Sequence, residues 1–412
     1  MSTKVNRRKF LLGAAAMASL PTMPAFAQAA PVRIGLLAAK TGPLATAGIQ
    51  LEQGLVTFLK TRKYTLAGRR VELVVADSGG NPAGAKTKVQ ELVERDKVDV
   101  ILGPLAAFEL LAINDYIIKA RIPILSTAAA DDISQRKPNP WLIRTTASSS
   151  QVPHVMGHYL ATDLKLKRMA VIADDFAYGY EQLGGFCRVF EENGGKIIKK
   201  LYSPLVTADY VPYIAQIANV DGTFTGIGGG TVRFVRQYAD LDRKAKTPLF
   251  GGQTTLDDSL LKNIGDEAIG VVTASCYTAS VDTPTNRAFV DDTVKEHGKF
   301  PGAYAAGMYL SGMVIEAALA KTGGKIDDKE AFVAAMRGVS LTDTPRGPLS
   351  FDRFGNAVGN IYVLRGERKN NLLVNTIIKT YPNVSQFWPY EQDKFLAQPV
   401  YSRDYPPAKN LE

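Results

Sequence analysis

The stretch VILGPLAAFELLA, residues 100–112, joins a short apolar strand to a helix through Gly103 and Pro104. A strand followed at once by a helix is the repeating unit of α/β proteins, and ligands bind at the carboxyl ends of such strands. This strand end carries no nucleophile, base or metal ligand before Glu109. The first N–H groups of the helix can still hold an anion, because the helix dipole favours negative charge there. The stretch therefore predicts an α/β fold with a site that binds rather than reacts.

The same unit recurs along the chain. Short apolar runs alternate with segments whose apolar residues fall on one helical face, such as Ala85, Val89 and Leu92. Continuous apolar strands of this length are typical of a parallel sheet covered by helices on both sides. Strands are predicted at residues 32–37, 71–76, 98–102, 122–125, 169–173, 197–202, 224–227, 248–250 and 271–275.

A polar segment of small residues, 142–150, interrupts this alternation and is predicted to be a linker. One sheet of nine strands is the alternative, but the helix–strand series restarts after the break, and 412 residues are too many for one ordinary domain. Two α/β lobes, each with a doubly wound parallel sheet, are therefore favoured. The chain then changes to hairpins, with a strand at 361–364 that turns at 365–366, and an irregular tail follows from Tyr381.

The first 27 residues resemble a secretory signal of the twin-arginine class. Arg7 and Arg8 precede an apolar run, and the sequence at 25–27 matches an A-x-A cleavage site. The run has about half of the roughly 20 residues that a membrane span needs. We therefore predict a soluble periplasmic protein that begins near Gln28, with a formal net charge lowered from +9 to +5 by loss of four cations.

Composition excludes some classes of partner and leaves the cysteines open. Lysine and arginine are interspersed with acids, and no basic stripe with aromatic residues appears, so nucleic acid is not an expected partner. Cys187 and Cys276 can pair in an oxidising periplasm. Two buried free thiols are the alternative.

Patterns that would indicate catalysis or a cofactor fail on their spacing. GIGGGT at 226–231 lacks the last glycine of G-x-G-x-x-G, so it is interpreted as a glycine-rich turn at the edge of a cleft. His154 and His158 lack the glutamate of H-E-x-x-H, which favours a surface or cleft-lining pair over zinc. Adjacent acids such as those at 257–258 are interpreted as helix caps, and no serine lies in G-x-S-x-G. We predict no catalytic residue, metal or cofactor, and the protein is not expected to be an enzyme.

Longer motifs carry a specific resemblance. The segments VRIGLLAAKTGPLATAGIQLEQG (32–54), IPILSTAAADD (122–132) and DDFAYGYEQLGGFCRVFEENGGKI (174–197) resemble the leucine/isoleucine/valine-binding family, the type I periplasmic solute-binding proteins of ABC importers. The resemblance covers roughly residues 31–380. It implies two lobes joined by a hinge with three crossings. Lobe one would comprise 31–146 and 277–349, lobe two 147–276 and 350–385, and residues 386–412 an irregular C-terminal extension.

The resemblance also implies a site between the lobes. Family members that bind amino acids hold the ligand carboxylate with amides and hydroxyls of two lobe-one loops. A tyrosine of a D-x-x-Y-G motif, a glutamate that pairs the α-ammonium group and a second aromatic residue complete their site. The corresponding ligand-binding residues here are Ala106, Ala107, Phe108, Ser126, Thr127, Ala128, Phe176, Tyr178, Gln253 and Tyr304.

Three substitutions within this pattern point away from an ordinary amino acid. Ala107 and Ala130 replace residues with hydroxyl groups, and Gln253 replaces the glutamate, so an ammonium group would lose its charged partner at a high free-energy cost. We expect a small organic or aromatic acid, and Gln253→Glu is expected to weaken its binding. A hydrophobic amino acid recognised differently and an amide-type ligand, as in sensors of this fold, are the alternatives. The expected partners are the ligand and membrane permease subunits, and the protein is expected to be a monomer.

Overall fold

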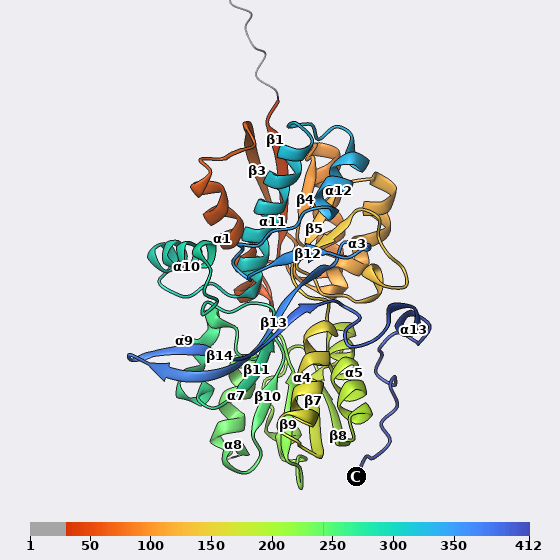
Figure 1. Ribbon diagram of the computed structural model, residues 1–412, viewed down its shortest axis with the longest axis vertical. Helices are drawn as coiled ribbons and strands as arrows, with labels where there is room; N and C mark the ends of the chain where they lie inside the picture. Colours follow the sequence, from red (N-terminus) through yellow and green to blue (C-terminus); the bar gives the residue numbers. More distant parts are fainter. Residues whose placement is uncertain (1–29, 242) are drawn as a thin grey trace, which may run out of the picture.

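The computed structural model describes residues 30–241 and 243–412, so the predicted signal, residues 1–27, lies outside the described residues. Two sheets, each flanked by helices, lie one beyond the other along the long axis of the molecule (Figure 1). The described chain begins in one lobe, and its C-terminus lies against the other (Figure 1).

The sheet of lobe one has six strands in the order β2-β3-β1-β4-β5-β6. Strand β1 is central and pairs in parallel with β3 and β4, and only the short β2 is antiparallel to its neighbour. The strands are β1 Val32–Ala38, β2 Thr65–Leu66, β3 Arg69–Asp77, β4 Val100–Leu102, β5 Ile124–Ser126 and β6 Leu142–Arg144.

The sheet of lobe two has eight strands in the order β12-β13-β11-β10-β9-β7-β8, with β14 paired to β13. Its five parallel strands continue into an antiparallel edge, because β13 runs opposite to β11. The strands are β7 Arg168–Asp174, β8 Lys196–Ser203, β9 Gly222–Gly226, β10 Leu249–Gly251, β11 Val272–Ser275, β12 Leu349–Phe351, β13 Ala357–Lys369 and β14 Leu372–Val384.

Helices cover both sheets. Those of lobe one are α1 Ala45–Thr61, α2 Pro82–Gln90, α3 Ala107–Ala120, α10 Pro284–His297, α11 Ala303–Lys321 and α12 Lys329–Arg337. Those of lobe two are α4 Gln151–Thr162, α5 Ala177–Glu192, α6 Val211–Ile214, α7 Thr231–Asp240, α8 Arg243–Lys246 and α9 Leu261–Ile264. The chain passes between the lobes three times, after β6, after β11 and before β12 (Figure 1). The predicted fold class is confirmed, and we propose the predicted lobe bounds as the division of the chain.

All nine predicted strands are present, but three expectations about the connections were wrong. The segment at 142–150 begins with strand β6, whose pattern is obscured by the buried Arg144. Strand β13 continues through 365–366 and turns instead at Asn370 and Asn371, which both have positive φ, a conformation that asparagine tolerates. The C-terminal tail predicted from Tyr381 is not irregular throughout, because strand β14 continues to Val384 and Gln392–Leu396 forms helix α13, capped by the carboxylate of Glu391.

Helix α11 is, among the described residues, the one helix long and apolar enough to span a membrane. In its most apolar window, 72% of the residues are buried inside the protein. It packs so closely on α1 that a side chain at Gly54 would collide with the carbonyl oxygen of Ala305. Helix α11 is therefore a core element of lobe one.

Cys187 and Cys276 are both buried and unbonded to each other, which matches the free-thiol alternative. Burial raises the pKa of the Cys187 thiol to about 12, so little of the reactive thiolate forms at neutral pH. We expect a maleimide to label neither cysteine in the native protein and both after unfolding in guanidinium without reductant. Mass spectrometry reads the result, and an unfolded protein that stays unlabelled would indicate a disulfide.

His154 does not line a cleft, as its spacing suggested, but is completely buried under the C-terminal tail. Its Nε2 atom lies 3.0 Å from the hydroxyl of Tyr401, and its ring packs against Tyr390 and Phe395. Burial lowers the pKa of His154 to about 3, so the ring is neutral. His154 therefore serves as an anchor for residues 386–412.

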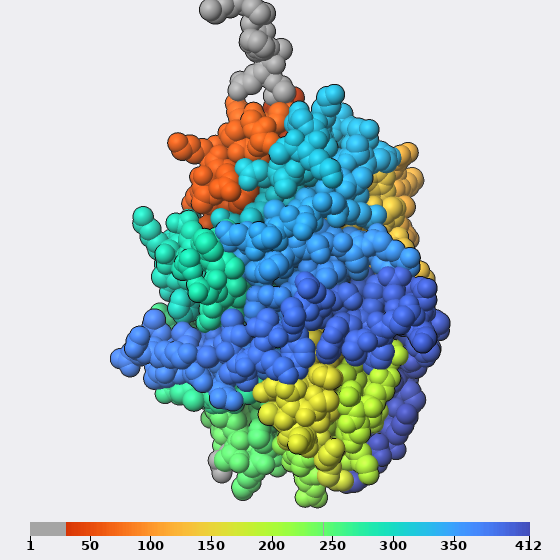
Figure 2. Space-filling view, in the orientation of Figure 1, coloured from red at the N-terminus to blue at the C-terminus, as the bar shows by residue number. Residues whose placement is uncertain are grey.

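His158, one turn further along α4, packs edge-on against Trp388, with 5.5 Å between ring centroids. The tail then runs over the α5 side of lobe two, where it is the darkest blue region of Figure 2. No group of three or more metal-binding side chains occurs within residues 30–241 and 243–412. Through their aromatic contacts with Tyr390, Phe395 and Trp388, the two histidines hold the tail in place.

Candidate ligand-binding site

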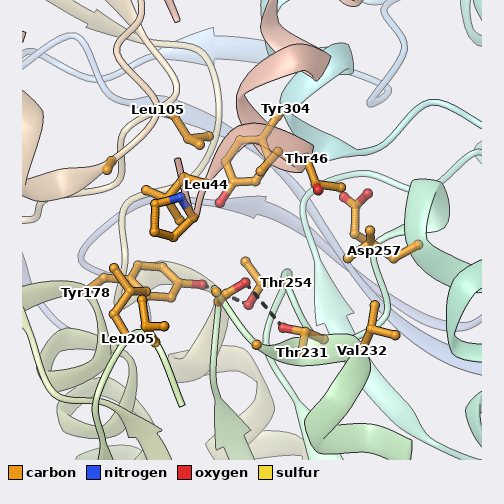
Figure 3. A pocket seen from close by; sticks show the side chains of 18 of the residues that line it. Leu44, Thr46, Leu105, Tyr178, Leu205, Thr231, Val232, Thr254, Asp257 and Tyr304 are labelled. Atoms are coloured by element: carbon orange, nitrogen blue, oxygen red, sulfur yellow. Dashed lines mark hydrogen bonds between the residues drawn. The ribbon is translucent and has the colours of Figure 1, made fainter. Parts of the chain in front are cut away.

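A cavity of about 740 Å³ lies between the lobes, where strands β1, β4 and β5 of one sheet and β7 to β10 of the other reach their carboxyl ends. The carboxyl edge of α/β sheets is where ligands generally bind, and pockets of ~300–1,000 Å³ are typical of small-molecule sites. Figure 3 shows side chains of both lobes converging on this space, with Leu105 and Tyr304 opposite Tyr178 and Thr231. Most of the wall is apolar.

The first turn of α3 forms one end of the cavity. Ala106 and Ala107 both line it, and Ala107 is the first helical residue, so the N–H groups of this turn have no partner within the helix. The carboxylate of Glu109 accepts the N–H of Ala106 at 3.1 Å and the hydroxyl of Ser78 at 2.5 Å. Glu109 thereby fixes the turn, and the N–H groups of the next residues remain free to bind an anion.

The loop after β5 lies beside this turn. The hydroxyl of Thr127 is buried against the cavity and has no hydrogen-bond partner among the described residues. Ser126 has a different role, because its hydroxyl donates to the carbonyl of Pro104 at 3.1 Å and accepts the N–H of Ala128 at 3.0 Å. Ser126 therefore ties the two loops together, and Thr127 offers the free polar group.

Aromatic side chains form the walls. Phe176 and Tyr178 come from the start of α5 and line the cavity. Tyr304, at the start of α11, lies across the space from Tyr178 (Figure 3). The hydroxyl of Thr254 donates to the carbonyl of Ile227 at 2.9 Å, so the Tyr178 hydroxyl, 3.3 Å away, donates to Thr254. This chain fixes the ring of Tyr178 and leaves flat apolar surfaces around the cavity.

The glycine-rich turn after β9 lines the lobe-two side, at the cleft edge where the sequence placed it. The N–H groups of Gly228 and Gly229 donate to Asp174 at 2.8 and 3.3 Å. Burial raises the pKa of Asp174 to about 6. Because the amides of this turn already hold a carboxylate of the protein itself, the turn is not arranged to bind a phosphate.

Asp257 is the one acid among the residues that line the cavity. One of its carboxylate oxygens accepts the N–H of Ala303, at the start of α11, at 2.8 Å, and the other accepts the N–H of Ser259 at 3.1 Å. Asp257 therefore caps its own helical turn, as its position in a pair of acids suggested, and also a helix of the opposite lobe. The carboxylate of Asp257 therefore links the two lobes, because it accepts one N–H group from each.

The structure brings together six of the ten predicted binding residues: Ala106, Ala107, Thr127, Phe176, Tyr178 and Tyr304 all line the cavity. The other four, Phe108, Ser126, Ala128 and Gln253, are not among its lining residues. Phe108 packs edge-on against Phe176, with 5.6 Å between centroids, and Ala128 is completely buried in the core.

Gln253 departs most from its expected role. Its side-chain oxygen accepts the S–H of Cys276 at 2.9 Å, and the next residue, Thr254, takes the place on the cavity wall. The expectation that Gln253→Glu acts directly on the ligand therefore has no support in the geometry.

Sequence reasoning missed Arg233 and Arg236, which line the cavity from α7. Their spacing of three residues would have placed them on one face of a helix.

Comparisons with known proteins agree with this architecture. A model of the periplasmic binding protein family matches residues 31–371. Leu/Ile/Val-binding protein homolog 6 of Brucella melitensis is 29% identical over 358 residues, which cover 84% of this chain and 89% of that protein.

Two solved structures of ligand complexes are also similar to this chain. A solute-binding protein of an ABC transporter from Rhodopseudomonas palustris BisB5, in complex with 3,4-dihydroxybenzoic acid, is 31% identical, with a TM-score of 0.82, over 86% of this chain and 98% of that one. A second R. palustris solute-binding protein, in complex with 4-hydroxybenzoate, is 27% identical, with a TM-score of 0.81, over 87% of this chain and 98% of that one.

Proposed function

Because the chain belongs to the periplasmic binding protein family, the non-enzymatic solute-binding components of ABC transporters, we propose that its cleft captures an aromatic carboxylic acid. The protein then delivers the acid to the membrane permease of an importer. The observation that carries this proposal is the pairing of free first-turn amides at Ala107 with aromatic walls at Tyr178 and Tyr304.

The two ends of such a ligand suit different parts of the cavity. The carboxylate lies at the first turn of α3, where backbone N–H groups and the Thr127 hydroxyl can donate to it. The ring lies between Phe176, Tyr178 and Tyr304, which can contact its faces and edges. The hydroxybenzoic acids in the two R. palustris proteins support this choice of ligand.

A hydrophobic amino acid is the second candidate, favoured by the Leu/Ile/Val-binding relatives. Its ammonium group would need an acidic partner, since leaving a charge unpaired in a closed cleft is costly. Asp257 lines the cavity, but its oxygens already accept N–H groups from Ala303 and Ser259. The aromatic acid needs no such partner and is therefore preferred.

A thermal-shift screen tests the ligand class. A ligand that binds only the folded protein stabilises it by RT ln(1 + [L]/Kd), which is about 2.7 kcal/mol at a hundredfold excess over Kd. We expect benzoate and hydroxybenzoates to raise the melting temperature, whereas 4-hydroxybenzamide, which lacks the charge, and leucine do not. A shift with leucine alone would favour the amino-acid function.

We also propose that the protein acts in the periplasm as a monomer after removal of the twin-arginine-like signal. Residues 25–27 supply the A-x-A cleavage site. Intact-mass analysis of protein from the periplasmic fraction is expected to give a chain that starts near Gln28. A mass that retains residues 1–27 would contradict this location.

Thr127→Val is expected to weaken binding of a hydroxybenzoate about tenfold, which corresponds to ~1.4 kcal/mol. The valine keeps the shape of the side chain but removes the one hydroxyl that is buried at the cavity without a partner among the described residues. Thr293→Val, on α10 and away from the cavity, is the control, because its hydroxyl bonds only to the carbonyl of Phe289. Equal affinities for the two variants would remove Thr127 from the site.

A further inference from the structure

The cavity extends well beyond the α3 amides. On the lobe-two side it reaches helix α7, where Thr231 and Val232 lie across the space from Leu105 (Figure 3). A volume of about 740 Å³ falls in the upper part of the ~300–1,000 Å³ range that accommodates drug-sized ligands. A single ring with one carboxylate leaves much of this volume unfilled.

Two arginines lie at the α7 end of the cavity. Arg233 and Arg236 are one turn apart on α7, and both line the cavity. Arg233 donates from Nη1 to the carbonyl of Thr207 at 2.8 Å, and Arg236 donates from Nε to the carbonyl of Ile264 at 3.2 Å. These neutral carbonyls hold each guanidinium in place without neutralising its charge.

Some other arginines of the described chain form ion pairs with carboxylates. Arg403 pairs with Asp175, and Arg368 pairs with Asp266. Within residues 30–241 and 243–412, no carboxylate forms an ion pair with Arg233 or Arg236. A guanidinium has five N–H donors, so each retains several that can bind a further acceptor, and a carboxylate is the acceptor that matches its geometry.

We propose that Arg233 and Arg236 form a second anion subsite, and that the preferred ligands are aromatic acids with a further carboxylate at the far end. This inference rests on the proposed function, because the first carboxylate is placed at α3. Leu205, Val206 and Leu260 also line the cavity, so the body of the ligand is apolar. Such a ligand would span the cleft and contact both lobes through charged ends.

Calorimetric titration with matched pairs of acids tests the subsite. The pairs are benzoate with terephthalate, and cinnamate with 4-carboxycinnamate, in which the second member adds only a para carboxylate. In the pair whose para carboxylate is far enough from the first carboxylate to reach α7, we expect the diacid to bind at least tenfold more tightly than the monoacid. In Arg233→Gln/Arg236→Gln this preference should fall to within twofold, because the second carboxylate loses its charged partners.

A charge-matched control separates contact from long-range attraction of anions. Lys246→Gln/Lys262→Gln removes two exposed cations of lobe two that do not line the cavity. It is expected to leave the preference for the diacid intact. Equal affinities for mono- and diacids in the wild-type protein, or an equal loss for both acids in both double variants, would overturn the subsite alone. Absence of binding by all four acids would overturn the proposed function together with it.

Discussion

An Ala107→Asp variant is expected to lose more than about a hundredfold in affinity for a hydroxybenzoate, a loss of ~3 kcal/mol. Ala107 is the first residue of α3 and lines the cavity. An aspartate there would place its carboxylate beside the same N–H groups that the ligand needs. Like charges in a closed cleft repel each other, and the site would be filled by the protein's own anion.

The same change should not damage the fold. The helix dipole favours a negative side chain in the first turn and offsets the cost of burying it at a position that is 4% exposed, so the variant without ligand should melt near the wild-type temperature. Ala107→Asn is the matched control, since it adds a side chain of the same shape without the charge. Equal affinities of the aspartate and asparagine variants would show that no anion binds at this end of α3.

Phe395→Ala is expected to lower the free energy of unfolding by ~3–5 kcal/mol, the range for loss of a buried phenylalanine. Phe395 is 1% exposed and lies at the centre of the contacts between the tail and the body of the protein. The guanidinium of Arg136, in lobe one, lies 5.2 Å from its ring, and that of Arg188, in lobe two, lies 5.5 Å from it. The change would leave a cavity beside the buried His154.

Chemical denaturation measures this effect, and the same tail supplies a control. Leu411 is 55% exposed, so Leu411→Ala should change the free energy of unfolding by less than ~0.5 kcal/mol. A loss below ~1 kcal/mol for Phe395→Ala would mean that the tail adds little to stability, contrary to its burial.

Nearly all parallel strands of both sheets could be predicted because parallel strands covered on both faces are continuous apolar runs. Strand β6 was missed for a physical reason, since its last residue, Arg144, is charged yet completely buried. Arg144 donates from Nε to the carbonyl of Ala128 at 2.9 Å and from Nη1 to the side chain of Asn356 at 2.8 Å. Because Asn356 lies 212 residues further along the chain, the sequence around Arg144 does not indicate that this arginine can be buried in a strand.

The site was predictable where it depends on local structure. The first turn of α3 and the aromatic start of α5 follow directly from strand–helix junctions, and both line the cavity. The choice between Gln253 and Thr254 depends on which of two adjacent residues faces inward after β10, and spacing alone does not decide this. The role of His154 depends on Tyr401, 247 residues later in the chain.

Isothermal titration calorimetry of the mature protein with 4-hydroxybenzoate and, separately, with isoleucine tests the central claim most directly. The free first-turn amides of α3 and the engaged carboxylate of Asp257 predict saturable one-to-one binding of 4-hydroxybenzoate and only heat of dilution with isoleucine. Saturable binding of isoleucine with none of 4-hydroxybenzoate would contradict the account.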